Sequence, residues 1–151
     1  MVKKLAGDVL GIGVIGCGWA GEQHSRVFSS LEGVVLEAVA DSDEAKAEKF
    51  GKRWNFSKVF KDYRALLEEP GIDAVSVCLP VDLHPKVVVE AAEKGKHILC
   101  EKPMAGSLED ADEMIEAADE DGVKLMVAEN VFYHPINNKR SEERRVGKEC
   151  I

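Results

Sequence analysis

The sequence is short of basic residues and of long apolar runs. Its 20 Lys and Arg residues stand against 28 Asp and Glu residues, which leaves a formal net charge of −8. This sign argues against a nucleic-acid or anionic-membrane partner, because both select basic surfaces. No run approaches the roughly 18 apolar residues of a membrane-spanning helix. With 151 residues, the chain is long enough for one domain with a full core and too short for two.

Cysteine is scarce as well, and the four residues show no spacing such as Cys-x-x-Cys that would indicate a metal site (Cys17, Cys78, Cys100 and Cys150). We therefore expect no bound metal. Cys78 and Cys100 lie in or beside apolar runs, which indicates buried thiols in a reduced, cytoplasmic protein.

The two ends of the chain are set apart from the fold prediction. Lys3 and Lys4 precede an apolar stretch, as in a secretion signal, but Asp8 interrupts that stretch. Arg140–Cys150 reads RSEERRVGKEC and has no apolar periodicity. This peptide resembles the translation of a widely used DNA-sequencing adapter; the alternative is a natural charged linker or helix end. We expect residues 140–151 to be an artefactual tail that derives from this adapter. The natural reading frame is then expected to continue beyond about Lys139, where the adapter has replaced it.

Strand-like and helix-like segments alternate along the rest of the chain. The expected strands cover residues 9–15, 34–40, 58–60, 74–79, 97–100 and 124–128. The expected helices cover residues 19–31, 43–54 and 63–68, followed by two helices with the apolar faces His84, Val87, Val88, Ala91, Ala92 and Leu108, Ala111, Ile115, Ala118. Strands that are apolar throughout, separated by amphipathic helices, predict an α/β fold: a Rossmann-type doubly wound parallel sheet of about six strands.

Local signals mark the ends of several helices. Ser107 and Asp110 form the start of a capping box ahead of the last helix. Gly33, Gly95 and Gly122 stand where a helix gives way to a strand, as a left-handed C-terminal turn requires.

The first motif with chemical content is Gly16-Cys17-Gly18-Trp19-Ala20-Gly21, a G-x-G-x-x-G that closes the first strand and opens the first helix. In this context Gly16 permits the tight turn, Gly18 lets the backbone approach a pyrophosphate, and Gly21 lets the helix pack close to the strand. The N-terminus of the helix offers N–H groups and the positive end of its dipole to the phosphates. The motif predicts a dinucleotide site; a plain strand-to-helix turn is the alternative.

Asp41 ends the second strand, 20 residues after Gly21. A carboxylate at this place can accept hydrogen bonds from ribose hydroxyls and would repel a 2′-phosphate. Ser42 follows, and no Lys or Arg appears before Lys46. The pattern favours NAD over NADP as the cofactor, with Asp41 and Ser42 in the site. The alternative is that Asp41 or Ser42 caps the next helix.

The stretch Val75–Met104 (VSVCLPVDLHPKVVVEAAEKGKHILCEKPM) resembles the Gfo/Idh/MocA family of glucose–fructose oxidoreductase and inositol dehydrogenase, above all in Glu101-Lys102-Pro103. Residues 11 to about 135 are similar to the family's N-terminal NAD(P)-binding domain. The resemblance implies hydride transfer between a nicotinamide cofactor and a secondary alcohol, often of a sugar or polyol. It also implies that Lys102 is a catalytic residue that assists a histidine from a second domain.

The same resemblance implies cofactor contacts from Leu79, Pro80, His84, Glu101 and Lys102, although His84 could equally be a satisfied capping residue. Two positions depart from the family pattern. Many relatives have Thr-Pro-Asn where this chain has Leu-Pro-Val, and Phe132 stands where relatives often place Arg. Apart from the resemblance, Lys102 follows the fifth strand, and open parallel sheets bind ligands at that end. Pro103 favours extended backbone at Lys102; a solvated surface lysine is the alternative.

These observations predict three segments. Residues 1–135 form the dinucleotide-binding domain of an NAD(P)-dependent oxidoreductase, residues 136–139 begin the crossover to a substrate domain that the chain lacks, and residues 140–151 are the tail. We expect the fragment to bind cofactor without turning over substrate. We expect the full-length enzyme to act on a small molecule and to be a homo-oligomer. An NAD-dependent glycosidase and a non-catalytic cofactor-binding sensor are the alternatives.

Overall fold

The computed structural model describes residues 9–130. Six parallel strands form one sheet in the order β3-β2-β1-β4-β5-β6, and the predicted doubly wound α/β fold is confirmed. The strands are β1 (Leu10–Ile15), β2 (Val34–Ala40), β3 (Lys58–Phe60), β4 (Ala74–Val77), β5 (His97–Cys100) and β6 (Leu125–Val127).

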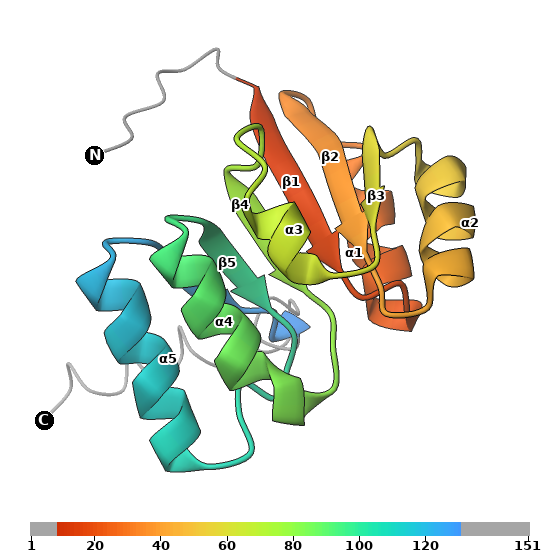
Figure 1. The fold of residues 1–151 in the computed structure, drawn as a ribbon. Coiled ribbons are helices and arrows are strands. Elements are labelled where there is room, and N and C mark those ends of the chain that lie inside the picture. Colours follow the sequence, from red (N-terminus) through yellow and green to blue (C-terminus); the bar gives the residue numbers. More distant parts are fainter. Residues whose placement is uncertain (1–8, 131–151) are drawn as a thin grey trace, which may run out of the picture.

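Helices cover both faces of the sheet (Figure 1). They are α1 (Trp19–Phe28), α2 (Glu44–Trp54), α3 (Tyr63–Leu67), α4 (His84–Glu93) and α5 (Leu108–Glu120), with a 3₁₀ turn, η1 (Val81–Leu83), ahead of α4. α1 and α2 pack on one face, and α3, α4 and α5 pack on the other. The strand order therefore reverses between β1 and β4, and ligands of such sheets bind where the carboxyl ends of these strands diverge.

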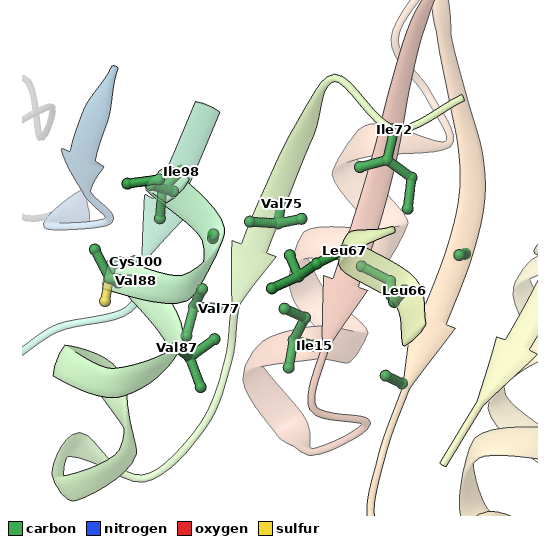
Figure 2. Close-up of a cluster of buried hydrophobic side chains, with 14 of the residues drawn as sticks. Ile15, Leu66, Leu67, Ile72, Val75, Val77, Val87, Val88, Ile98 and Cys100 are labelled. Carbon is green, nitrogen blue, oxygen red and sulfur yellow. The ribbon is translucent and has the colours of Figure 1, made fainter. Parts of the chain in front are cut away.

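The sheet separates two apolar clusters. In the larger one, Leu66 and Leu67 of α3 lie over Ile15, while Val87 of α4 lies beside Val77 (Figure 2). The other cluster joins the face under α1 and α2 and includes Phe50 and Phe56, whose ring centroids are 6.1 Å apart. Because both faces of the sheet are covered, the strand sequences are largely apolar and do not alternate strictly between apolar and polar residues.

The predicted helix ends are largely confirmed. Gly33, Gly95 and Gly122 have φ angles of +76°, +67° and +66°, the left-handed values that glycine adopts without strain. The Ser107 side chain accepts a hydrogen bond from the Asp110 N–H, as the capping pattern predicts. The first helix ends at Phe28, earlier than the predicted residue 31.

The start of α2 corrects one alternative. Asp43, and neither Asp41 nor Ser42, caps this helix, because its side chain accepts the N–H of Lys46. Helix capping therefore does not explain the carboxylate of Asp41 at the end of β2.

α5 buries only part of the predicted face, namely Ala118. Leu108 and Ile115 were expected in the core, but they are 80% and 46% exposed, whereas Met114 is fully buried together with Ala118. Met114 and Ile115 are adjacent and lie about 100° apart around the helix axis. Only the packing of α5 against α4 decides which of the two faces inward. Within residues 9–130, no helix has the length and apolarity to span a membrane.

Candidate functional site

A cleft of about 810 Å³ opens at the carboxyl ends of β1, β2 and β4, beside the point where the strand order reverses. Six of the predicted cofactor residues line it: Gly16, Gly18, Asp41, Ser42, Leu79 and Pro80. Residues that are up to 64 positions apart in the sequence thus meet at one place, because parallel strands all end at the same edge of the sheet.

In the turn between β1 and α1, two of the three glycines are required by the packing of the protein itself. Gly16 has a φ of +102°, and a Cβ there would lie 2.3 Å from the carbonyl oxygen of Cys78. A Cβ at Gly21 would lie 2.1 Å from the carbonyl oxygen of Gly16. No side chain fits at either position, so these glycines bring α1 close to β1 and β4.

Gly18 is different, because nothing within the described residues lies within 4 Å of the place where its Cβ would be. Its φ of −80° is also open to any residue. Gly18 is the N-cap of α1, and no described side chain caps the helix. The first turn of α1 therefore presents backbone N–H groups and the positive end of the helix dipole beside an open cradle, which suits an anion.

Asp41 also lines the cleft, and it braces the glycine turn from the end of β2. Its Oδ2 accepts a hydrogen bond from the Cys17 N–H at 2.8 Å and from the Lys46 ammonium at 3.0 Å, and its Oδ1 accepts from the Asp43 N–H at 3.0 Å. Burial, the largest influence, would raise the pKa of Asp41. The three donors outweigh burial and lower that pKa below its ordinary value of 3.8.

Sequence reasoning missed the basic residues of the cleft. The cleft is lined by two carboxylates, Asp41 and Asp62, and by four cationic side chains: Lys46, Lys61, Arg64 and Lys86. Lys46 pairs with Asp41, and Arg64 pairs with Asp62 and Glu90, so the positive charge that remains to attract an anionic ligand comes from Lys61 and Lys86. Lys61 and Arg64 follow β3, so the rule that ligands bind at the carboxyl ends of strands could have indicated them.

The remaining predicted residues do not line this cleft. Trp19 is 79% exposed at the start of α1, with Ala20 beside it. His84 is buried; its Nε2 lies 2.9 Å from the Leu79 carbonyl oxygen, and its Nδ1 lies 3.1 Å from that of Pro103. His84 therefore joins the loop after β4 to the turn after Lys102.

Glu101 and Lys102 follow β5 at the same edge of the sheet. The Glu101 carboxylate faces His24 of α1 at 3.1 Å instead of the cleft, and it also accepts the Lys102 N–H at 3.0 Å. The Lys102 side chain is exposed, and the Lys102–Pro103 peptide bond is cis.

Comparison with known proteins decides the family. Residues 10–129 match the family described as GFO_IDH_MocA, oxidoreductase family, NAD-binding Rossmann fold. The chain belongs to the Gfo/Idh/MocA family. The sequence resemblance is thereby confirmed, and the chain is an NAD-binding domain of the oxidoreductase type.

Individual Gfo/Idh/MocA proteins match only over part of their length. Myo-inositol 2-dehydrogenase of Thermotoga maritima is 34% identical over 79% of this chain and 36% of its own. A 3-ketoreductase from Actinomadura kijaniata, solved with NADP and TDP-benzene, has a TM-score of 0.84 at 29% identity and matches 93% of this chain and 43% of its own. An Agrobacterium radiobacter oxidoreductase, solved with NAD⁺, L-tartaric acid and magnesium, has a TM-score of 0.79 at 28% identity and matches 82% and 36% of the two chains.

The residues present fit the dinucleotide that the Gfo/Idh/MocA family description names. Gly18 leaves room for a pyrophosphate where the protein's own packing does not require a glycine. The cleft has a volume typical of a small-molecule site. Since the neighbours include complexes with NAD⁺ and with NADP, the cofactor class is NAD(P).

The three thiols that the structure describes in this Gfo/Idh/MocA domain have pKa values raised above the ordinary range. Cys100 is buried as predicted, and Cys17 is buried too. Cys78, which was also expected to be buried, is only partly buried and lines the cleft. Burial is the main cause that raises the pKa of each of the three thiols to about 12. They are therefore protonated at neutral pH and serve as small apolar groups.

The environment of Asp41 predicts a pH-dependent contribution to stability. The carboxylate has a lower pKa in the folded chain than in the unfolded chain. Its stabilising effect is therefore complete above the unfolded pKa of about 3.9 and disappears as the pH falls through the lower folded value. We expect Asp41→Asn to lower the free energy of unfolding at pH 7, and the difference from the unchanged chain to shrink below about pH 4.

Urea unfolding at a series of pH values measures this difference, with Asp112→Asn on the exposed side of α5 as a control. A stability difference that stays constant from pH 7 to about pH 2.5 would show that the hydrogen bonds to Asp41 do not favour its charged form.

Proposed function

We propose that the chain binds NAD(H) in this cleft, and that the protein to which the domain belongs oxidises or reduces a secondary alcohol carbon of a sugar or polyol. The observation that carries the cofactor proposal is the open cradle at Gly18 below the uncapped N-terminus of α1. The substrate class is supported by relatives named for a polyol and for sugars, such as myo-inositol 2-dehydrogenase, levoglucosan dehydrogenase and D-xylose 1-dehydrogenase.

The proposal gives each group a role. The backbone of residues 16–21, including Trp19 and Ala20, holds the pyrophosphate through N–H groups. Asp41 accepts hydrogen bonds from the hydroxyls of the adenosine ribose, and the Ser42 hydroxyl donates to it. Leu79 and Pro80, which follow β4, contact the cofactor from the other strand end. When bound, the nicotinamide supplies the hydride chemistry. Lys102, at the end of β5, is the catalytic residue that donates hydrogen bonds to the substrate oxygen.

The described histidines do not provide a general base. His24 is held by Ser76 and Glu101, both ring nitrogens of His84 face backbone carbonyls, and the Nδ1 of His97 accepts the N–H of Lys124. A proton must leave the hydroxyl as the hydride leaves the carbon. We therefore propose that the acid or base comes from a segment beyond the described residues. His134, like Phe132, lies outside residues 9–130.

Titration of the purified chain with NADH, followed by calorimetry, tests the cofactor proposal. We expect saturable binding of one NADH per chain, because every group assigned to the dinucleotide lies within residues 9–130. Absence of binding at millimolar NADH, in a chain whose circular dichroism shows it to be folded, would contradict the proposal.

We also propose that NAD is preferred over NADP, because the carboxylate of Asp41 would repel a 2′-phosphate. The double variant Asp41→Ala, Ser42→Arg is expected to move the ratio of the NADH and NADPH dissociation constants toward NADPH by about 100-fold. Removing a like charge and adding a charged hydrogen bond each contribute roughly 1.4 kcal/mol or more. Lys46, which pairs with Asp41 in the unchanged chain, becomes free to meet the phosphate.

Calorimetric titration with both cofactors measures that ratio. The single variant Ser42→Ala serves as the control, since it removes the hydroxyl and leaves the Asp41 carboxylate in place. An unchanged ratio in the double variant would show that the 2′ position of the ribose does not face Asp41.

A further inference from the structure

Four polar side chains meet at one place: His24 of α1, Ser76 of β4, Cys78 just after β4 and Glu101 just after β5. His24 of α1 lies between Ser76 of β4, whose Oγ is 2.7 Å from its Nδ1, and Glu101, whose Oε1 is 3.1 Å from its Nε2. The Sγ of Cys78 lies 3.4 Å from the Ser76 Oγ and 3.6 Å from the His24 Nδ1. The side chains of His24 and Glu101 are only 15% and 17% exposed.

With a neutral His24 ring, the hydrogen-bond capacities of these groups fit one direction of donation. A carboxylate only accepts, so the Nε2–H of His24 donates to Glu101, and its Nδ1 accepts the hydroxyl of Ser76. The Ser76 oxygen in turn accepts from the Cys78 thiol. The second oxygen of Glu101 accepts the backbone N–H of Lys102 at 3.0 Å. Every donor in this chain of bonds has an acceptor, which makes the arrangement rigid.

The order of hydroxyl, imidazole and carboxylate is that of a nucleophilic triad, but the surroundings exclude this chemistry. The Ser76 side chain is fully buried and cannot reach a substrate. The thiol of Cys78 is held protonated, since burial raises its pKa to about 12. The network must therefore act through what it holds in place.

What it holds in place is the strand end that carries Lys102. His24 belongs to the helix whose first turn borders the cradle at Gly18, and Glu101 is the residue directly before Lys102. Through these two side chains, a helix proposed to bind the pyrophosphate contacts the segment proposed to bind the substrate. The bond from the Lys102 N–H to Glu101 ties the backbone of Lys102 to the same carboxylate that His24 contacts.

We propose that His24 is a positioning residue: acting through Glu101, it fixes the direction of Lys102 relative to the N-terminus of α1. The positional part rests on geometry alone, whereas its use in catalysis rests on the function proposed above. The network thus links occupancy of the cofactor cradle to the placement of the catalytic lysine.

Amide hydrogen exchange of the ¹⁵N-labelled chain, followed by NMR, tests the positional part without any cofactor. His24→Phe keeps a ring against Phe28, which His24 meets edge-on at 6.1 Å between centroids, but it removes both ring nitrogens. We expect the Lys102 amide to exchange about tenfold faster in this variant, the effect of one lost hydrogen bond. The amides of Val14 and Val75 in the central strands serve as internal controls and should be unchanged.

His24→Gln is the matched variant, because its side-chain amide can donate to Glu101 again. We expect it to restore most of the Lys102 protection, which a general loosening of α1 would not produce. Equal Lys102 exchange in the unchanged chain and in both variants would overturn the proposal, as would an equally large acceleration at Val14 and Val75. If His24→Phe does not fold, His24→Leu takes its place: it also removes both ring nitrogens, and its Lys102 amide should exchange about tenfold faster than that of His24→Gln.

Addition of NADH then tests the link to the cofactor. In the unchanged chain, we expect the Lys102 amide resonance to shift on binding; in His24→Phe, NADH should bind within about threefold of the same affinity, but the Lys102 shift should be lost. An equal shift in both chains would overturn the link. Failure of the unchanged chain to bind NADH would refute the proposed function instead, and the exchange comparison without cofactor would still decide the role of His24.

Discussion

Replacement of Lys102 by alanine in a full-length enzyme that contains this domain is expected to lower kcat/KM by about 100-fold or more. This is the range for a positioned proton-transfer or charge-stabilising group. Lys102 stands at the carboxyl end of β5, while the cradle and Asp41 lie at the ends of β1 and β2. The dissociation constant for NAD(H) should therefore change by less than about threefold.

Steady-state kinetics and cofactor titration on the same preparations check both halves of this prediction. Lys124→Ala, an exposed lysine just before β6, is the control and should retain full activity. If the Lys102 variant also kept full activity, Lys102 would be a surface lysine and the catalytic assignment would be lost.

Replacement of Gly18 by valine is expected to weaken NADH binding to the chain by about 100-fold or more while the fold is preserved. The new Cβ meets no atom of residues 9–130 within 4 Å, and valine can adopt the backbone angles of Gly18. It would occupy the cradle and separate the pyrophosphate from the first turn of α1. Loss of two hydrogen bonds to a charged group costs about 3 kcal/mol or more.

Gly106 offers a matched control, because a Cβ there also meets open space and the residue does not line the cleft. Gly106→Val should bind NADH normally, and circular dichroism should show that both variants are folded without denaturant. Equal binding by Gly18→Val and Gly106→Val would show that the open space at Gly18 is not the cofactor cradle.

The fold could be predicted from the sequence because its signals are local and agree with one another. Apolar runs mark the strands of a sheet covered on both faces, and glycines with positive φ mark the helix ends. The G-x-G-x-x-G turn and Asp41 follow strands whose order the fold determines, so their meeting in one cleft could be predicted too.

What could not be predicted depends on tertiary contacts. Nothing local tells whether Met114 or Ile115 faces inward, since both lie on the same helix and only α4 chooses between them. The sequence likewise does not reveal that Glu101 turns toward His24, 77 positions earlier, or that His84 bonds to carbonyl groups on two separate loops. Side-chain direction at a strand end is set by neighbours from other elements.

The exposed indole of Trp19 gives the domain an optical property. The chain has two tryptophans, and they occupy different surroundings: Trp19 stands in water at the edge of the cradle, whereas the Nε1 of Trp54 donates to Glu22 at 3.0 Å. Indole emission overlaps the absorption of a reduced nicotinamide, so a dinucleotide held near Trp19 would receive its excitation energy. Quenching of intrinsic fluorescence would then report occupancy without a label, and Trp54→Phe would leave Trp19 as the single emitter.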